Sequence, residues 1–144
     1  MDKYYTLKGY KLRNRNKVTE AMEDYIEMIY KNTQDKDEIS IKEISNLLNV
    51  KYSSTTNMLD RLKELDLVNY DKYKKVSLTI KGIHLGKYLL YRHNILTTFF
   101  RLLNKNDYHL EEVEKIEHYI SVKTIKNLEK IINNRCLWFF LHIW

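Results

Sequence analysis

The chain has 144 residues, which is enough for one compact domain or two small domains that share an interface. Its formal net charge of +6 favours an anionic partner, nucleic acid first and a membrane surface second. The single cysteine, Cys136, excludes an intramolecular disulfide, and the apolar stretch 136–144 is far too short to cross a bilayer. Because residues 1–17 are polar and basic, no signal peptide is predicted, and we expect a cytoplasmic protein without a membrane-spanning segment.

The first predicted segment, residues 1–18, is a flexible basic arm. Its positive charges stand among tyrosines and asparagines. Such an arm either contacts phosphates or is simply disordered, and the sequence leaves both interpretations open. The charged side chains are Lys3, Lys8, Lys11, Arg13, Arg15 and Lys17.

A helix is predicted to begin at Thr19, a good N-cap, with a glutamate in the first turn, where the helix dipole favours negative charge. Asp24 and Glu27 lie one turn apart, on a face away from the apolar side chains Ile26 and Ile29. Taken alone, two carboxylates at this spacing are typical of a solvated helix surface.

Two short helices joined by a tight turn follow. Ser40 and Glu43 form a capping-box pattern that opens the first helix, and Ser53 is predicted to cap the second after the turn 49–52. This arrangement is typical of a helix-turn-helix, although an ordinary helical hairpin with a polar surface is the alternative. The side chains predicted to face phosphates and base edges are Lys51, Ser53, Ser54, Thr56, Asn57 and Arg61.

A two-stranded hairpin is predicted next, from the short alternating segments 67–70 and 75–79. A helix-turn-helix followed directly by a basic hairpin favours a winged helix over the plain helical hairpin. We therefore expect residues 19–80 to form a winged-helix DNA-binding domain. The lysines at or near the hairpin tip, which would lie beside the DNA backbone, are Lys72, Lys74 and Lys75.

One long helix is predicted from Thr79 to about Asn104. Its apolar face is wider than one small domain needs, so we expect part of it to be buried against a second copy of the chain. With two later helices separated at Ser121, it would form a helical domain over residues 81–144, and the fold is predicted to be mainly α. The aromatic tail 136–144 either packs into the dimer or forms an exposed apolar patch.

The helix predicted over residues 113–120 carries a group of potential metal ligands. Glu117 and His118 lie three and four residues after Glu114, so all three share one face, separate from the apolar stripe. Two carboxylates and an imidazole on one face can bind a divalent metal through oxygen and nitrogen. A solvated surface helix can show the same pattern, so spacing alone leaves both interpretations open.

Three short motifs surround the predicted winged helix in a fixed order. Met22-Glu23-Asp24-Tyr25-Ile26-Glu27 precedes it, Tyr91-Arg92-His93 follows it, and Val113-Glu114-Lys115-Ile116-Glu117-His118 comes last. With these motifs in this order, the chain resembles the diphtheria-toxin-repressor family of metal-dependent transcription regulators, and within it the manganese branch. The resemblance covers about residues 20–133.

The resemblance implies a homodimer, not an enzyme, that binds an operator in double-stranded DNA and represses manganese-uptake genes. Asp24 and Glu114 stand where the iron branch has a methionine and a cysteine, and a set of oxygen and imidazole ligands suits manganese. The implied ligands include four carboxylates, which can bridge two ions, so two Mn²⁺ ions per subunit are expected. They are Asp24, Glu27, His93, Glu114, Glu117 and His118.

Three departures from the family pattern bear on these expectations. Tyr52 stands where the recognition helix often begins with a proline, the basic arm is longer than usual, and the aromatic tail replaces a more polar ending. The alternatives are a winged-helix regulator that responds to iron, zinc or a small organic ligand, an architectural DNA-binding protein, and a di-metal oxidase. The oxidase is disfavoured because such sites typically need two Glu-x-x-His helices, and the sequence contains none.

Overall fold

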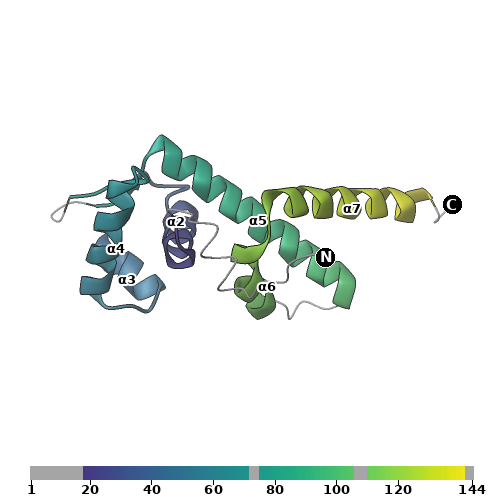
Figure 1. The fold of residues 1–144 in the computed structure, drawn as a ribbon, viewed down its shortest axis with the longest axis horizontal. Helices are drawn as coiled ribbons and strands as arrows, with labels where there is room; N and C mark the ends of the chain where they lie inside the picture. Colours follow the sequence, from purple (N-terminus) through teal and green to yellow (C-terminus); the bar gives the residue numbers. More distant parts are fainter. Residues whose placement is uncertain (1–17, 72–74, 106–109, 142–144) are drawn as a thin grey trace, which may run out of the picture.

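The computed structural model describes residues 18–71, 75–105 and 110–141, with side chains in the last stretch described as far as residue 134. The basic arm, Lys72, Lys74 and the side chains of the aromatic tail therefore lie outside the described residues. Figure 1 shows the helix-turn-helix and the hairpin at one end of the molecule, and α5 running from there to α6 and α7 at the other end. The elements are α2 (Glu20–Asn32), α3 (Ile41–Leu47), α4 (Tyr52–Glu64), β1 (Val68–Asn69), β2 (Ser77–Leu78), α5 (Ile80–Asn104), α6 (Leu110–Ile116), η1 (Glu117–Tyr119) and α7 (Val122–Leu141).

The mainly helical, winged-helix architecture confirms the predicted fold class. At the start of α2, the Thr19 hydroxyl accepts a hydrogen bond from the Met22 amide at 3.4 Å, as its N-cap position predicts. At the start of α3, the Glu43 amide donates to the Ser40 hydroxyl, while the Glu43 carboxylate accepts from the Ser40 amide at 2.9 Å. The capping box expected from the sequence is therefore confirmed.

The predicted start of the second helix of the helix-turn-helix is wrong by two residues. Lys51, not Ser53, is the N-cap of α4, and it makes no side-chain capping bond. The turn closes earlier because Asn49 adopts a left-handed backbone conformation, with φ of 52°, which asparagine tolerates well. The Lys51 carbonyl then accepts from the Ser54 and Thr55 amides, which places Ser53 inside the first turn.

A buried polar contact holds the two helices of the helix-turn-helix together. Thr55 of α4 is completely buried, and its hydroxyl accepts a hydrogen bond from the Ser45 hydroxyl of α3 at 2.9 Å. The Tyr25 hydroxyl of α2 lies 3.5 Å from the same oxygen. Each buried hydroxyl thereby keeps a partner, and the orientation of α4 is fixed relative to both α2 and α3.

The predicted wing is confirmed as an antiparallel hairpin, with Val68 opposite Leu78 and Asn69 opposite Ser77. An isolated bridge extends this pairing, because the backbones of Ile39 and Val76 exchange two hydrogen bonds of 2.9 and 2.8 Å. This bridge attaches the wing to the segment between α2 and α3.

Two glycines allow α5 to approach the DNA-binding domain closely. A Cβ atom on Gly82 would lie 2.0 Å from the carbonyl oxygen of Leu67, and one on Gly86 would lie 2.6 Å from Cβ of Tyr30 in α2. Neither position has room for a side chain, so α5 packs directly against α2 and the end of the wing.

The helix predicted over residues 113–120 changes its winding part of the way along. The α-helix α6 ends at Ile116, and the 3₁₀ turn η1 carries the chain from Glu117 to Tyr119. Because a 3₁₀ helix turns 120° per residue instead of 100°, the side chains after Ile116 are rotated relative to the expected faces. Glu117 is consequently completely buried, and Ile120 is only half-buried.

The last helix begins where the sequence predicts and continues further. The Ser121 hydroxyl accepts from the Thr124 amide at 3.2 Å, which confirms Ser121 as a cap, and α7 then extends to Leu141. Within the described residues, no helix is both long enough and apolar enough to cross a membrane.

Candidate metal centre and nucleic-acid interface

Three potential metal ligands meet where α5 passes α6 and η1. His93 lies near the middle of α5, Glu114 on α6 and Glu117 at the start of η1. The His93 Nδ1 atom is 3.1 Å from Glu117 Oε2 and 3.6 Å from Glu114 Oε1. One ligand atom from each residue lies within 4.8 Å of the others, a spacing that allows all three to bind one ion.

The burial of Glu117 identifies this cluster as more than a charged helix surface. Its side chain is 1% exposed, and its Oε1 atom has no hydrogen-bond partner among the described residues. A buried, unpaired carboxylate oxygen is unfavourable unless a cation or donor reaches it. The predicted alternative of a solvated helix face is wrong for Glu117, whereas Glu114 remains half-exposed and open to solvent.

Electrostatics within the cluster follow from the same contacts. The hydrogen bond to Glu117 raises the pKa of His93, despite the opposing effect of burial. Partial burial raises the pKa of Glu114, and the negative charge of Glu117 raises it further. A carboxylate such as Glu114, whose charged form is disfavoured by burial and by a neighbouring negative charge, would be stabilised by a divalent cation.

His118 is held between two consecutive carboxylates of α2. Its Nε2 atom lies 3.2 Å from Asp24 Oδ1, and its Nδ1 atom lies 2.8 Å from Glu23 Oε2. These two hydrogen bonds, the one to Asp24 above all, raise the pKa of His118 to about 10. The contact joins α2, which belongs to the DNA-binding domain, to η1 in the second helical domain.

Two residues of this group, Glu23 and Arg92, are absent from the ligand set expected from the sequence. The Arg92 guanidinium is 3% exposed, and its Nη2 donates to Glu23 Oε2 at 2.9 Å. Burial alone would raise the pKa of Glu23, but the hydrogen bonds from His118 and Arg92 outweigh it and lower the pKa. The sequence did indicate that Arg92 is buried, because it lies at helical spacing between the apolar residues Leu89 and Leu96, which are both buried.

Glu27 is buried, which corrects the prediction that it lies on a solvated face of α2. Only 7% of the residue is exposed, and its Oε1 atom lies 2.6 Å from the Lys31 ammonium one turn further along. Glu27 and Lys31 are close enough to His93 and Glu114 to influence both of their pKa values. In this structure Lys31 therefore neutralises the carboxylate that faces the cluster.

Five of the six predicted ligands thus fall into two adjacent groups. His93, Glu114 and Glu117 form one, and Asp24 and His118 form the other, with the groups linked through the consecutive residues 117 and 118. Glu27 lies beside the first group, paired with Lys31. The donors are carboxylate oxygens and imidazole nitrogens, a set that suits a divalent cation of the harder kind.

The exposed face of α4 carries most of the side chains predicted to contact DNA. Thr56 is half-buried, and its hydroxyl donates to the Ser53 carbonyl at 2.9 Å. Lys75 is exposed where the wing begins its return strand. The exposed members of this predicted DNA-contacting set on or next to α4 are Lys51, Ser53, Ser54, Asn57 and Arg61.

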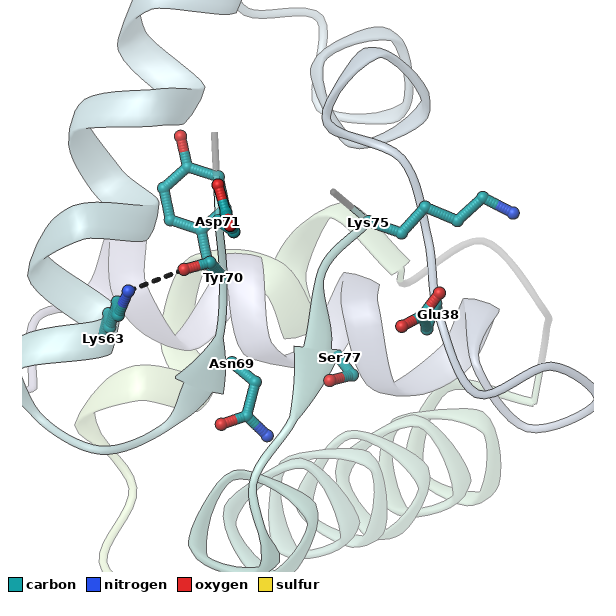
Figure 2. Close-up of a pocket in the computed structure, with 7 residues that line it drawn as sticks. All are labelled: Glu38, Lys63, Asn69, Tyr70, Asp71, Lys75 and Ser77. Carbon is teal, nitrogen blue, oxygen red and sulfur yellow. Dashed lines mark hydrogen bonds between the residues drawn. The ribbon is translucent and has the colours of Figure 1, made fainter. Parts of the chain in front are cut away.

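A hollow of about 290 Å³ lies beside the two strands of the wing (Figure 2). Lys63 of α4 donates to the Tyr70 carbonyl at 2.7 Å across one side of it. The lining mixes acidic and basic side chains, and it shares no residue with the metal-ligand groups. It is lined by Glu38, Lys63, Asn69, Tyr70, Asp71, Lys75 and Ser77.

A winged helix joined to a buried carboxylate–histidine centre defines the class of a metal-dependent, DNA-binding transcriptional regulator rather than an enzyme. Two family models match consecutive parts of the chain. "Iron dependent repressor, N-terminal DNA binding domain" matches residues 17–76, and "Iron dependent repressor, metal binding and dimerisation domain" matches residues 79–135. The chain belongs to this family of iron-dependent repressors, the diphtheria-toxin-repressor family.

Relatives named HTH-type transcriptional regulator MntR align with most of the chain. Those of Shouchella clausii and Bacillus subtilis are each 36% identical over 115 residues, covering 79% of this chain and 80% and 81% of the relatives. The solved structure of the manganese regulator SloR is 32% identical, with a TM-score of 0.65, and ScaR with bound Zn²⁺ is 26% identical, with a TM-score of 0.67. The match covers 78% of this chain but only 53% of those two chains, so it spans about half their length.

Proposed function

We propose that this protein is a manganese-responsive repressor of manganese-uptake genes that acts in the cytoplasm as a homodimer on an operator in double-stranded DNA. The observation that carries the proposal is the cluster of His93, Glu114 and the buried Glu117 beside the Asp24–His118 contact. The MntR name of its relatives and the manganese regulation stated for SloR support manganese as the signal.

The donor set supports manganese more than iron or a later transition metal. Positions 24 and 114 provide carboxylates, and the two groups contain no sulfur ligand. Thiolate and thioether ligands select softer metals, whereas carboxylate and imidazole ligands accept Mn²⁺. Selectivity then depends on the number and geometry of ligands, because Mn²⁺ stands low in the Irving–Williams order.

Two ions per subunit fit this set of ligands better than one. The first group offers His93, Glu114 and Glu117, and the second offers Asp24 and His118. Glu27 becomes available to an ion only when the Lys31 ammonium moves away from its Oε1 atom. In this arrangement the bound ions supply positive charge that offsets the repulsion between the neighbouring carboxylates.

The ligands connect the two halves of the regulator. Asp24 and Glu27 belong to α2, against which the helix-turn-helix packs, whereas His93, Glu117 and His118 belong to elements of the second domain. Occupancy of both groups favours one relative placement of the DNA-binding and dimerisation domains. A ligand shifts such an equilibrium only by its difference in affinity for the two states.

The expected DNA complex places α4 in the major groove and the wing beside the backbone. In a homodimer, two copies of α4 must reach half-sites roughly 34 Å apart, about one turn of DNA. Lys51, Arg61 and Lys75 are exposed, which supports their assignment to phosphate or base contacts. Each phosphate contact neutralised by a lysine or arginine contributes about 0.9 to the slope of log affinity against log salt.

The test is DNA binding by the full chain, with genomic fragments as the probe and metal as the variable. We expect operator fragments to be retained with Mn²⁺ and released with a chelator. Parallel titrations with Fe²⁺ and Zn²⁺ separate a manganese regulator from one that responds to another metal. Equal DNA affinity with Mn²⁺ and with chelator would contradict the metal switch.

Glu117→Gln tests the ligand assignment directly. It preserves the shape of the buried side chain but removes its charge, so metal-dependent DNA binding should be lost while the fold remains. The matched control is Glu111→Gln, since Glu111 is exposed on α6 and pairs only with Lys115 among the contacts described. A normal metal response in Glu117→Gln would show that the ligands are elsewhere.

A further inference from the structure

The two nitrogen atoms of His118 have different partners. Nε2 points toward Asp24 and is 3.2 Å from its carboxylate, whereas Nδ1 points toward Glu23, at 2.8 Å. A histidine that binds a metal through one ring nitrogen usually donates its other N–H to a carboxylate or carbonyl, which fixes the ring and the tautomer. Glu23 stands in the place of that outer carboxylate.

Glu23 is itself fixed by a buried cation. Arg92 is 3% exposed in the middle of α5, and its Nη2 donates to Glu23 Oε2, the same oxygen that contacts His118. Arg92 Nη2 also lies 3.4 Å from His118 Nδ1, but the shorter contact to Glu23 is where the Nδ1 proton is donated. The guanidinium, the carboxylate and the imidazole therefore form one chain of contacts from α5 through α2 to η1.

We propose that Glu23 and Arg92 are positioning residues for the metal centre: Arg92 holds Glu23, and Glu23 accepts the Nδ1 proton of His118, so that Nε2 is presented beside Asp24. This inference rests on the proposed function. It adds that the His118 imidazole is oriented before metal arrives, by a pair of charged residues that do not themselves bind the ion.

The competing explanation is that Glu23–Arg92 is only an ion pair between helices. In that case its loss would lower the stability of the metal-free chain without changing metal affinity beyond what reduced folding explains. A positioning role predicts a loss of metal affinity in a protein that remains folded, and a change in the nitrogen through which His118 binds. These two outcomes can be measured separately.

The experiment titrates the full chain with Mn²⁺ and follows the signal of the free ion by electron paramagnetic resonance. Glu23→Gln preserves size and removes charge, and we expect it to weaken Mn²⁺ binding by about 10- to 100-fold, the usual effect of losing such a partner. Arg92→Met should weaken binding in the same direction, and Arg92→Lys should recover part of the loss because the positive charge returns. Glu111→Gln is the matched control and should bind as the unmodified chain does.

A second readout addresses the imidazole itself. In the Zn²⁺-loaded protein, which is diamagnetic, ¹⁵N spectroscopy distinguishes a metal-bound ring nitrogen from one that carries a proton. We expect His118 to bind Zn²⁺ through Nε2 with Nδ1 protonated, and Glu23→Gln to weaken or mix this state. Thermal unfolding of each metal-free variant shows whether it is folded, and Glu23→Gln decides the question if Arg92→Met unfolds.

The failures can be told apart. Mn²⁺ affinity of Glu23→Gln within twofold of the unmodified chain would overturn the positioning role while leaving the proposed function intact. Binding of Zn²⁺ through Nδ1 of His118 in the unmodified chain would also overturn it. An unmodified chain that binds no Mn²⁺ would instead overturn the manganese proposal, and this inference with it.

Discussion

The two ends of the molecule differ in how completely they bury their own apolar residues. The DNA-binding end has an extensive core to which α2, α3, α4 and the wing all contribute, and Ile26, Ile44 and Leu59 are completely buried in it. The other end is built around a much smaller cluster, Leu96, Val113 and Ile125.

The second end also leaves large apolar side chains exposed. Leu103 is 58% exposed and Ile131 is 49% exposed, and both line a hollow of about 130 Å³ between α5 and α7. A domain that keeps such a surface needs a partner to cover it. The family model describes this domain as one for metal binding and dimerisation. The comparison teaches that the DNA-binding end is stabilised by its own core, whereas the second end leaves an apolar surface that a partner could cover, as expected of a dimerisation domain.

The largest expected effect comes from the core of the DNA-binding end. Leu59→Ala removes a completely buried side chain and leaves a cavity, which should lower the free energy of unfolding by about 3 kcal/mol. Chemical denaturation followed by far-ultraviolet circular dichroism measures it. Leu103→Ala is the comparison. Because Leu103 is largely exposed, this substitution should lower the free energy of unfolding of the monomer far less. Equal losses in the two variants would remove the contrast between the ends.

A slightly smaller effect is expected where α5 meets the wing. In Gly82→Ala the new Cβ atom would lie 2.0 Å from the Leu67 carbonyl oxygen, so the backbone must shift. This shift should lower the free energy of unfolding by about 1–3 kcal/mol. Gly86→Ala should cost less stability because its Cβ would lie 2.6 Å from Tyr30 Cβ, so the overlap to be relieved by moving α2 and α5 apart is smaller. The thermal midpoints of the two variants test this order, and a reversed order would contradict it.

The third prediction concerns the surface that a second copy should cover. Ile131→Asp places a charge in the apolar hollow, and we expect the dimer dissociation constant to rise at least tenfold, about 1.4 kcal/mol. Sedimentation equilibrium measures the constant, with Lys126→Asp, an exposed position on the same helix, as the control. The unfolding of the DNA-binding end should not change. An unchanged dimer dissociation constant in Ile131→Asp would show that the dimer interface lies elsewhere.

The smallest expected effect lies between α5 and α7. The Tyr91 hydroxyl donates to Glu129 Oε2 at 2.7 Å. Tyr91→Phe removes this hydrogen bond and should lower the free energy of unfolding by about 1 kcal/mol. This bond raises the pKa of Tyr91 to about 12, so the neutral phenol is favoured in the folded state. The stabilisation that this hydrogen bond gives the folded state is therefore fully present below pH 10 and is lost as the pH rises toward 12. Unfolding of both proteins at pH 8 and pH 11 should show the difference narrowing, and a constant difference would contradict the assignment.

Local sequence signals correctly predicted where several helices begin. Thr19 and Ser121 act as caps and Ser40 forms its box with Glu43, because capping depends on residues within one turn. The start of α4 was predicted wrongly because the left-handed backbone at Asn49 closes the turn early, and residue preference at Ser53 did not reveal this.

The candidate site was predicted less completely than the fold. Residue types and order indicated Asp24, His93 and Glu117, but an assumed continuous helix hid the burial of Glu117 by the 3₁₀ turn. The roles of Glu23 and Arg92 depend on contacts between residues far apart in the chain, such as the 95 positions that separate Glu23 from His118. Helical spacing within one segment carries no information about such contacts.

The uninterrupted course of α5 has a mechanical consequence. This helix has 25 residues and is therefore about 37 Å long at 1.5 Å per residue. Arg92 and His93 lie at its midpoint, while its first turns pack on the wing and its last turns carry the exposed leucines. A tilt of about five degrees about that midpoint would move each end by roughly 1.6 Å, from the helix length alone. A small tilt of α5 at the metal-ligand groups would therefore produce a larger displacement at both of its ends.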